Sequence, residues 1–457
     1  MAPTVARPLC GHPRRPEVRG RGRAPGRPGV RHTRLVTYKV TNWAGNIAFR
    51  ADHVERPSTV AELRSLIGRA GKVRVLGSGH SFNEIADSAG ALVSLDGLPA
   101  EVEIDTASAT VRVAASVRYG DLGRRLHEKG YALPNLASLP HISVAGSCAT
   151  GTHGSGDANG GLATAVAAIE MVTASGDLVT LSRAADPGRF PGAVVALGAL
   201  GAVVGLTLDL VPAFEVRQSV YEGLDARVLD DHFDDVVSAA YSVSLFTDWR
   251  TSAVNQVWVK ERMDGGTPAE PAAGFFGAVA ADGPRHPVPG VSPIHCTQQM
   301  GEPGPWFERL PHFRPDFTPS SGEELQSEFM VPRRHAVAAF HAVDAIREHI
   351  APVLQISEIR TIAADDLWLS PSQGRDTVAF HFTWVKDPQA VLPVLARIED
   401  ALAPFDARPH WGKLFTLAPA VVASRYERLG DFRALAREYD PRGVFANEFV
   451  TRHVLTG

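Results

Sequence analysis

The stretch VRVLGSGHSFNEIA, residues 73–86, decides the fold, because an apolar strand runs directly into a glycine-rich loop within it. Residues 72–76 are typical of a strand, and GSGHS follows at 77–81. Exposed backbone N–H groups in such a loop can approach phosphate oxygens. Phe82 fills the third glycine position of the dinucleotide fingerprint, which excludes that motif. The stretch therefore indicates a phosphate-binding loop of a different kind.

A second loop, residues 136–156, consists almost entirely of small residues, glycines and hydroxyl side chains. It is too long for a simple turn, and long loops without secondary structure are usually functional. Its run GTHGSG at 151–156 lacks the lysine of a P-loop. His141 and His153 could suggest a metal pair, but no third ligand accompanies them, so we expect no metal site.

Helices and strands alternate along the chain. Residues 59–62 have capping-box spacing and begin a helix, and residues 110–117 and 119–129 predict a strand and a helix. Ala336, Phe340, Val343 and Ile346 form one stripe, which predicts a single amphipathic helix over residues 333–350. A further helix is expected at 390–402, and residues 264–293 are expected to be a Pro/Gly/Ala-rich loop.

Composition and charge exclude several classes of protein. The chain has 457 residues, 44% of them hydrophobic, which is enough for a substantial core. Its net charge is −4, but residues 1–34 hold nine arginines against Glu17 alone, and we expect residues 1–35 to be a disordered tail. The remaining chain is acidic, so we expect no nucleic-acid partner.

Two further features bear on location. Residues 190–208 carry no charge, but they hold four glycines, so a buried turn and strand is favoured over a membrane span and no membrane partner is expected. The three cysteines cannot build a disulfide framework, which indicates a cytoplasmic protein. We expect a monomer.

Three strand-like segments place polar residues among apolar ones. In residues 354–362, Glu358 and Arg360 share a face with Ile356 and Ile362, and in residues 377–385 a wholly apolar face opposes His381 and Thr383. Residues 410–417 also predict a strand, in which Lys413 shares a face with Trp411, Phe415 and Leu417. On pattern alone, a surface ion pair and an edge lysine explain Glu358, Arg360 and Lys413 best.

The two loops, taken together with PHWGK at residues 409–413, resemble the alditol oxidases. These are FAD-dependent oxidases of the vanillyl-alcohol oxidase superfamily, on the branch that includes the sugar-lactone oxidases. The resemblance runs from about Thr41 to the end of the chain. It implies an α+β fold with a two-subdomain FAD-binding domain of the vanillyl-alcohol oxidase / p-cresol methylhydroxylase type at residues 36–213. It further implies a cap domain with an antiparallel sheet flanked by helices at 214–408, and a C-terminal return to the active site at 409–457.

The resemblance implies FAD as the cofactor, held covalently through His80 at the 8α-methyl carbon of the flavin. The residues that it places around FAD are Val75, Leu76, Gly77, Ser78, Gly79, His80, Ser81, Ser138, Ser143, Gly146, Thr150, Gly151, Thr152, His153 and Val203.

The resemblance also reverses the interpretation of the polar strand residues. It implies that a polyol binds to Ser138, Glu358, Arg360, Thr383 and Lys413, with Arg360, Lys413 and His381 as catalytic residues. The implied reaction oxidises the terminal CH₂OH of an alditol such as xylitol or sorbitol to the aldose. Hydride passes to flavin N5, and O₂ is reduced to H₂O₂. The proton acceptor stays open between His381 and Glu358, and an alkoxide held by two cations needs no strong base. The alternative is an aldono-1,4-lactone oxidase or dehydrogenase on the same scaffold.

Overall fold

The computed structural model describes residues 40–263, 272–316 and 322–456. The chain divides into two units, Met1–Tyr38 and Lys39–Gly457, and the second holds all the described helices and strands. The predicted tail and residues 264–271 of the predicted loop lie outside the described residues.

The stretch at 73–86 begins in a small parallel sheet of order β1 (Val54–Glu55), β3 (Ala91–Val93) and β2 (Val73–Val75). Helix α1 (Val60–Arg69) packs against it, burying Leu63 and Ile67 completely. The helix begins at Thr59, whose side chain accepts a hydrogen bond from the backbone N–H of Glu62, as the capping-box spacing predicts. Because β2 ends at Val75, the glycine-rich residues 77–81 form a loop at its carboxyl end.

The segment at 136–156 is not wholly the loop that was expected, because it contains the short helix α3 (Val144–Ala149), which packs on a second sheet. Its five antiparallel strands run in the order β4 (Val102–Asp105), β5 (Thr110–Ala114), β9 (Ala202–Asp209), β7 (Val166–Val172) and β8 (Leu178–Ser182). Helices α2 (Tyr119–His127) and α3 (Val144–Ala149) share its apolar core. The uncharged run 190–208 forms the short helix α4 (Phe190–Val194) and strand β9. Within the described residues, no helix is long and apolar enough to cross a membrane.

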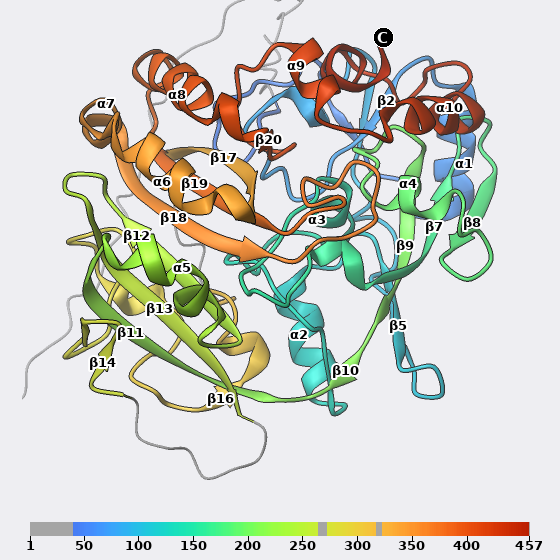
Figure 1. Cartoon of the computed structure of the whole chain (residues 1–457). Coiled ribbons are helices and arrows are strands. Elements are labelled where there is room, and N and C mark those ends of the chain that lie inside the picture. The colour runs from blue at the N-terminus through green and yellow to red at the C-terminus, as the bar shows by residue number, and fades with distance from the viewer. Residues whose placement is uncertain (1–39, 264–271, 317–321, 457) are drawn as a thin grey trace, which may run out of the picture. The chain divides into compact units, whose positions relative to one another are not determined.

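A ten-stranded antiparallel sheet forms the cap, in the order β14-β15-β11-β13-β12-β18-β19-β17-β20, with β16 paired to β11 (Figure 1). Strands β18 and β19 have the predicted bounds, and the antiparallel cap sheet is confirmed. The strands are β11 (Glu215–Asp225), β12 (Ser242–Thr247), β13 (Ala253–Met263), β14 (Gly274–Phe275), β15 (Ala278–Ala280), β16 (Gly304–Pro305), β17 (Glu324–Pro332), β18 (Leu354–Ile362), β19 (Thr377–Val385) and β20 (Arg408–Pro409).

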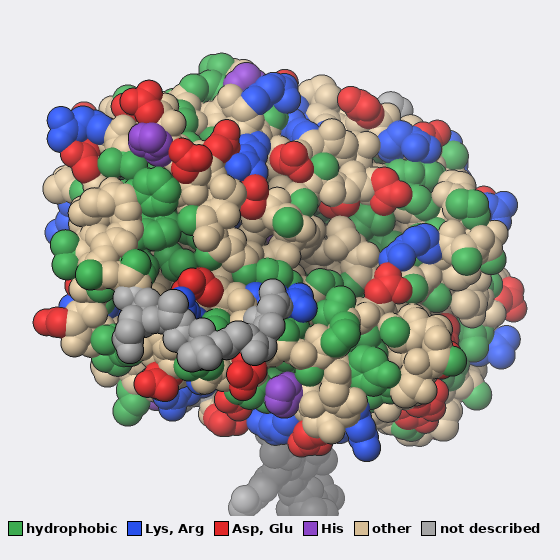
Figure 2. All heavy atoms as spheres, turned by 60° about the horizontal axis from the view of Figure 1, so that its bottom comes forward, with side chains coloured by type: hydrophobic (Ala, Val, Ile, Leu, Met, Phe, Trp, Pro, Cys, Tyr) green, Lys and Arg blue, Asp and Glu red, His purple; other side chains and the backbone are tan. Residues whose placement is uncertain are grey.

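Helices cover one face of this cap sheet. Helices α5 (Val228–Ser238), α6 (Ala336–Asp344) and α8 (Pro388–Leu402) bury their apolar stripes against it (Figure 1). The apolar face predicted for β19 lies in this same core. The opposite face, which carries the polar residues of β17, β18 and β19, is therefore turned toward the glycine-rich loops. On the surface drawn in Figure 2, basic side chains are interspersed with acidic ones.

The single helix predicted over residues 333–350 is wrong. The segment forms a 3₁₀ turn (Arg333–His335), α6, and the short helix α7 (Arg347–Ile350). Ile346, with φ −112° and ψ 13°, breaks the helix, and the Asp344 carboxylate accepts hydrogen bonds from Arg347 beside the break. The apolar stripe continues across it, since Ile350 is fully buried. The apolar stripe therefore predicted the buried face correctly, but it gave no sign of the helix break at Ile346.

The strand predicted over residues 410–417 is also wrong. Strand β20 ends at Pro409, and a turn follows in which the Lys413 N–H donates to the His410 carbonyl at 3.1 Å. The backbone N–H groups of His410 and Leu414 donate to the carbonyls of Glu328 and Gln326 on β17, at 2.9 and 2.8 Å. Lys413 therefore projects from a turn between two anchoring hydrogen bonds.

The C-terminal segment packs beside the two smaller sheets. Helices α9 (Pro419–Ser424), α10 (Leu429–Tyr439) and α11 (Glu448–Val450) share the apolar cluster of the five-stranded sheet. Val444 lies in the cluster around β2, and its carbonyl accepts a hydrogen bond from the Val73 N–H at 2.8 Å.

Arg74 joins four chain segments beneath the glycine-rich loop. Its guanidinium donates to the carbonyls of Gly198 and Phe445, both at 2.9 Å, and to those of Ile85 at 2.6 Å and Leu197 at 2.7 Å. Burial lowers the pKa of Arg74 to about 10. It remains charged at neutral pH, and it ties β2 to the C-terminal segment.

Replacing Arg74 by Met removes all four hydrogen bonds and leaves buried carbonyls without a donor. Because each lost hydrogen bond of this kind costs about 1–3 kcal/mol, we expect a loss of at least about 3 kcal/mol in the free energy of unfolding, measured by chemical denaturation. Arg64→Met is the matched control, since that exposed arginine makes one hydrogen bond, from Nε to the Gly176 carbonyl, and a 3.9 Å surface ion pair with Asp177. Equal effects of the two substitutions would contradict the role given to Arg74.

Candidate active site

A cavity of about 460 Å³ lies between the cap sheet and the two glycine-rich loops. Strands β17, β18 and β19 supply one wall, and residues 74–82 and 137–153 supply the other. All the predicted cofactor residues except Gly151 line it, as do all the predicted substrate residues and His381. Gly151 is instead required by packing, because its φ is +69° and a Cβ there would lie 2.9 Å from Pro371.

The loop wall of the cavity is shaped as a close backbone cradle. A Cβ on Gly77 or on Gly146 would lie 2.8 Å from the Ser143 hydroxyl oxygen. That hydroxyl is buried and has no hydrogen-bond partner among the described residues. Glycine at these two positions therefore allows the loops to approach closely. The backbone N–H groups of the loops and the free hydroxyl of Ser143 suit the diphosphate of a dinucleotide cofactor.

His80 lies at the end of this cradle. Its ring stacks on Trp43, with centroids 5.0 Å apart and an interplanar angle of 21°. Both ring nitrogens are buried and have no hydrogen-bond partner within the described residues. Burial, together with Arg118 and His141, lowers the pKa of His80 to about 4, so the imidazole is neutral at neutral pH. A neutral, oriented and unpaired imidazole is suited to bonding with an electrophilic cofactor carbon.

Glu328 on β17 is the centre of the site, and it is not among the residues predicted from the sequence. Its side chain is 1% exposed and accepts hydrogen bonds from Arg360 Nη2 at 2.6 Å and from Lys413 Nζ at 2.7 Å. His153 Nε2 lies 3.2 Å from its Oε1. Burial alone would raise the pKa of Glu328, but Lys413, His153 and Arg360 hold it well below the usual range. Its sequence signal is like that of His381 on β19, since Gln326 and Glu328 share the strand face opposite Leu325 and Phe329.

The predicted substrate residues come together around this carboxylate. Arg360 Nη1 donates to the Ser138 hydroxyl at 3.2 Å, and Arg360 Nε lies 3.5 Å from Glu358 Oε2. His312 Nε2 lies 2.7 Å from Glu358 Oε1. Burial would raise the pKa of Glu358, but Arg360 and His312 lower it far below its usual value. Ser138 therefore reaches the cap residues from the opposite wall.

His381 and His410 are neutral in the site. Burial and Lys413 lower the pKa of His381 well below its usual value, and that of His410 to about 3. His381 Nε2 lies 3.2 Å from Gln326 Oε1, and the Gln326 amide nitrogen donates to Glu324, which fixes the orientation of that amide. His381 therefore donates from Nε2, and its buried Nδ1 keeps a free lone pair.

Comparison with known proteins gives two family matches and close relatives. Residues 51–182 match the model described as "FAD binding domain", and residues 323–453 match "D-arabinono-1,4-lactone oxidase". The chain is 57% identical over 423 residues to "Alditol oxidase" of a Streptomyces species, covering 92% of this chain and 99% of that protein. It is 28% identical over 438 residues to "L-gulono-1,4-lactone dehydrogenase" of Mycobacterium tuberculosis, covering 91% of this chain and 98% of that protein.

Among solved structures, the cholesterol oxidase of B. sterolicum superposes with a TM-score of 0.71 at 16% identity, covering 91% of this chain and 96% of that one. At this identity the likeness shows the fold alone.

Replacing Glu328 by Gln keeps the side-chain shape but leaves Arg360 and Lys413 without their shared carboxylate. Because breaking a buried ion pair costs about 3–5 kcal/mol, we expect a clear fall in Tm at neutral pH. In the wild type, the lowered pKa of Glu328 stabilises the fold at every pH above the pKa of a glutamate in the unfolded chain, about 4.3. This stabilisation is lost as the pH falls toward the pKa of Glu328 in the folded protein. The difference in Tm between the wild type and E328Q should therefore narrow below about pH 4.

Asp225→Asn is the control for this pH series. The exposed Asp225 also has a lowered pKa, of about 2, because Arg227 donates hydrogen bonds to it. Solvent screens that pair, so its loss should change Tm little at any pH. A wild-type to E328Q difference that stays constant from neutral to acid pH would contradict the ion-pair role of Glu328.

Proposed function

Because this chain belongs to the alditol oxidase family and binds FAD, we propose that it oxidises the terminal primary alcohol of an alditol to the aldose, with O₂ reduced to H₂O₂. Xylitol and sorbitol are the substrates to test first. The observation that carries this proposal is the joint placement of Arg360 and Lys413 on Glu328, in the cavity that the FAD cradle also lines.

A polyol suits the chemistry of the cap wall. Each hydroxyl of a polyol both donates and accepts a hydrogen bond, so its site needs acceptors and donors side by side. Glu358 supplies an ionised acceptor, Arg360 and Lys413 supply charged donors, and the hydroxyls of Ser138 and Thr383 supply either. Hydrogen bonds within the protein hold Glu358, Arg360, Lys413 and Ser138 in place before substrate enters.

The reaction removes a hydride from carbon and a proton from oxygen. When bound, FAD supplies the acceptor for the hydride. Arg360 and Lys413 stabilise the negative charge that develops on the reacting oxygen. Glu358 is already engaged by His312 and Arg360. His381 Nδ1 lies in the site with a free lone pair, and we assign the hydroxyl proton to it. The pKa values of both groups are lowered, but the two cations make a strong base unnecessary.

A second function is oxidation of an aldono-1,4-lactone. It is favoured by the match of residues 323–453 to the D-arabinono-1,4-lactone oxidase model. Lactones also carry hydroxyl groups, so the same side chains could bind them.

The test of function is a peroxide-coupled assay of the purified yellow protein with xylitol, sorbitol, L-gulono-1,4-lactone and D-arabinono-1,4-lactone. We expect kcat/KM for the alditols to exceed that for the lactones by at least about tenfold, which is about 1.4 kcal/mol in transition-state binding. A higher kcat/KM for a lactone than for the alditols would show that the enzyme is an aldono-1,4-lactone oxidase instead. Flavin reduction without peroxide would show a dehydrogenase.

We also propose that His80 holds the flavin covalently, which its neutral, unpaired ring and its stacking on Trp43 support. Acid precipitation of the protein should therefore leave the yellow colour in the pellet. His80→Ala should release the flavin to the supernatant, while His141→Ala, on the same side of the cavity, should not. Release of flavin from the wild-type protein would rule out the linkage.

Lys413→Met keeps the length of the side chain and removes its charge and its donors. Losing a hydrogen bond to a charged group costs about 1.5–3 kcal/mol, so we expect kcat/KM for xylitol to fall by about 10- to 150-fold. The flavin spectrum serves as the control for loading, and Lys129→Met, an exposed lysine, as the matched substitution. A change of less than about twofold would remove Lys413 from the site.

A further inference from the structure

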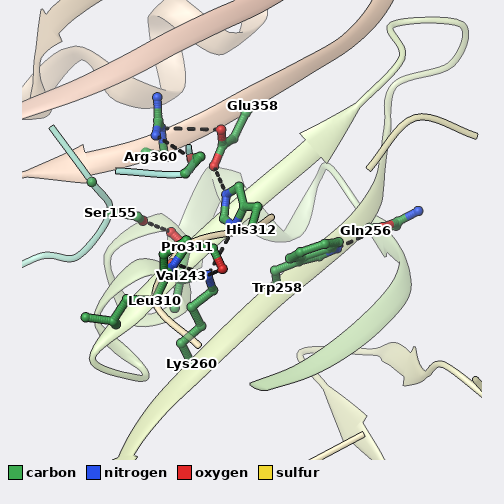
Figure 3. Close-up of polar contacts among 12 residues, drawn as sticks. Ser155, Val243, Gln256, Trp258, Lys260, Leu310, Pro311, His312, Glu358 and Arg360 are labelled. Atoms are coloured by element: carbon green, nitrogen blue, oxygen red, sulfur yellow. Dashed lines mark hydrogen bonds and ion pairs between the residues drawn. The ribbon is translucent and has the colours of Figure 1, made fainter. Parts of the chain in front are cut away.

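A buried lysine lies behind the substrate wall, where neither the sequence patterns nor the proposed reaction uses it. Lys260 on β13 is 0% exposed. Its ammonium donates to the carbonyls of Leu310 and Pro311, the latter at 3.2 Å, and its Nζ lies 3.1 Å from His312 Nδ1 (Figure 3). No carboxylate bonds to Lys260 directly in the part of the chain that the structure describes.

The hydrogen bonds of Lys260 determine the tautomer of His312. A charged amine has three N–H donors and no acceptor. Two of them are taken by carbonyls, so the third points at Nδ1, which must accept. Burial and Lys260 lower the pKa of His312 to about 4, so the ring is neutral and carries its proton on Nε2. That N–H donates to Glu358 Oε1 at 2.7 Å.

The His312 ring is held in this orientation by aromatic neighbours. Trp258 meets it edge-on with centroids 5.1 Å apart, and Phe246 meets it edge-on at 5.5 Å. Because these neighbours keep the ring from turning over, Nδ1 always faces Lys260 and Nε2 always faces Glu358. The hydrogen bonds of the ring therefore depend only on which nitrogen carries the proton. Figure 3 shows the resulting line from Lys260 through His312 to Glu358 and Arg360.

We propose that Lys260 is a positioning residue of the active site, which acts through His312 to hold Glu358 as an ionised acceptor for a substrate hydroxyl. This inference rests on the proposed function, because it names the residue that orders one of its substrate contacts. Lys260 itself does not touch the substrate. Its role is to keep a proton on the side of His312 that faces Glu358.

Loss of the proton from Lys260 reverses this arrangement. A neutral amine still donates to the two carbonyls, but it then presents a lone pair to Nδ1. The proton of His312 is drawn to Nδ1, and the Nε2 lone pair then faces the Glu358 carboxylate. The carboxylate then loses the donor at Oε1 and keeps only the longer ion pair of Oε2 with Arg360 Nε, at 3.5 Å, so it is held less firmly.

The groups that face Lys260 allow this change near neutral pH. Burial lowers its pKa to about 7, with Glu358 opposing and Arg360 assisting the shift from β18. His312 and Cys296 face it from the loops, and burial raises the pKa of the Cys296 thiol to about 12, so that group stays neutral. We therefore expect KM for the polyol to rise with pH through about 7, by about tenfold or more.

The decisive variant is His312→Gln, whose amide N–H can donate to Glu358 but has no tautomers. Its KM should be moderately higher than that of the wild type and should not vary between about pH 6 and about pH 9. Lys260→Met, which removes the ammonium, should give a KM that is high and equally flat. Lys129→Met controls for a general effect of losing a lysine and should keep the wild-type pH profile.

A rise of KM with pH in His312→Gln that matches the wild type would overturn the proposal, because the titrating group would then lie elsewhere, with Lys413 the first alternative. Flavin content and Tm show whether each variant is folded and loaded.

A readout independent of turnover separates this inference from the proposed function. In protein carrying ¹⁵N-labelled histidine, the signal of His312 is identified by its loss in His312→Gln. It should report a protonated Nε2 and a bare Nδ1 near pH 6, and Lys260→Met should shift it. If no polyol reduces the flavin but the tautomer is as expected, the proposed function fails and the positioning role stands. The opposite tautomer would refute the positioning role whatever the substrate.

Discussion

The structure depends on one buried carboxylate, Glu328, and on the cations that surround it. Removing a carboxylate from water is costly, and the cost is offset only when charged donors meet it at hydrogen-bond distance. The two cations are Arg360, from the neighbouring part of the cap sheet, and Lys413, from the C-terminal segment. The ion-pair cluster therefore joins three separate stretches of sequence, and none of the three can move away without leaving a buried charge uncompensated.

Backbone hydrogen bonds align the same stretches. The carbonyls of Glu328 and Gln326 accept from the backbone of His410 and Leu414, so the turn that carries Lys413 has no freedom to slide along β17. On the other side, the Gly156 N–H donates to the Thr361 carbonyl at 3.1 Å, next to Arg360. Side-chain charge and main-chain pairing thus fix the same geometry. A site held in this way before substrate enters needs little reorganisation during the reaction.

The sequence predicted those parts of the fold where periodicity was simple. Strand β19 was predicted to its ends because a wholly apolar face alternates with the face of His381 and Thr383. Strand β18 was also predicted to its ends, although its Glu358 and Arg360 share a face with apolar residues. The turn at Lys413 was predicted as a strand, since Trp411, Phe415 and Leu417 have strand spacing although only tertiary contacts bury them. The break at Ile346 was missed because the apolar stripe continues through it.

The missed site residues share one cause. Glu328, His312 and Lys260 are ordinary polar residues in sequence, and they become distinctive only when three strands and a loop bring them to the same buried place. Glu358 and Arg360 were found because a known family uses those positions, not because the i, i+2 pattern distinguishes a cavity wall from a surface ion pair. Alternation along a strand identifies which side chains share a face, but the burial of that face depends on which segments cover it.

The charges of the completed site have a consequence for the chemistry. Lys260, Arg360 and Lys413 are set against Glu328 and Glu358, and the pKa values of His312, His381 and His410 are low enough to keep those rings neutral. While Lys260 is protonated, these groups carry one excess positive charge in a region shielded from water. A neutral polyol does not balance that charge, whereas the partial negative charge that grows on its oxygen as hydride leaves does. The site is therefore more complementary to the transition state than to the bound alcohol, which is the condition for an interaction to raise kcat rather than only lower KM. The same excess charge explains why weakly basic groups suffice, because the proton is lost from an oxygen whose anionic form the site already favours.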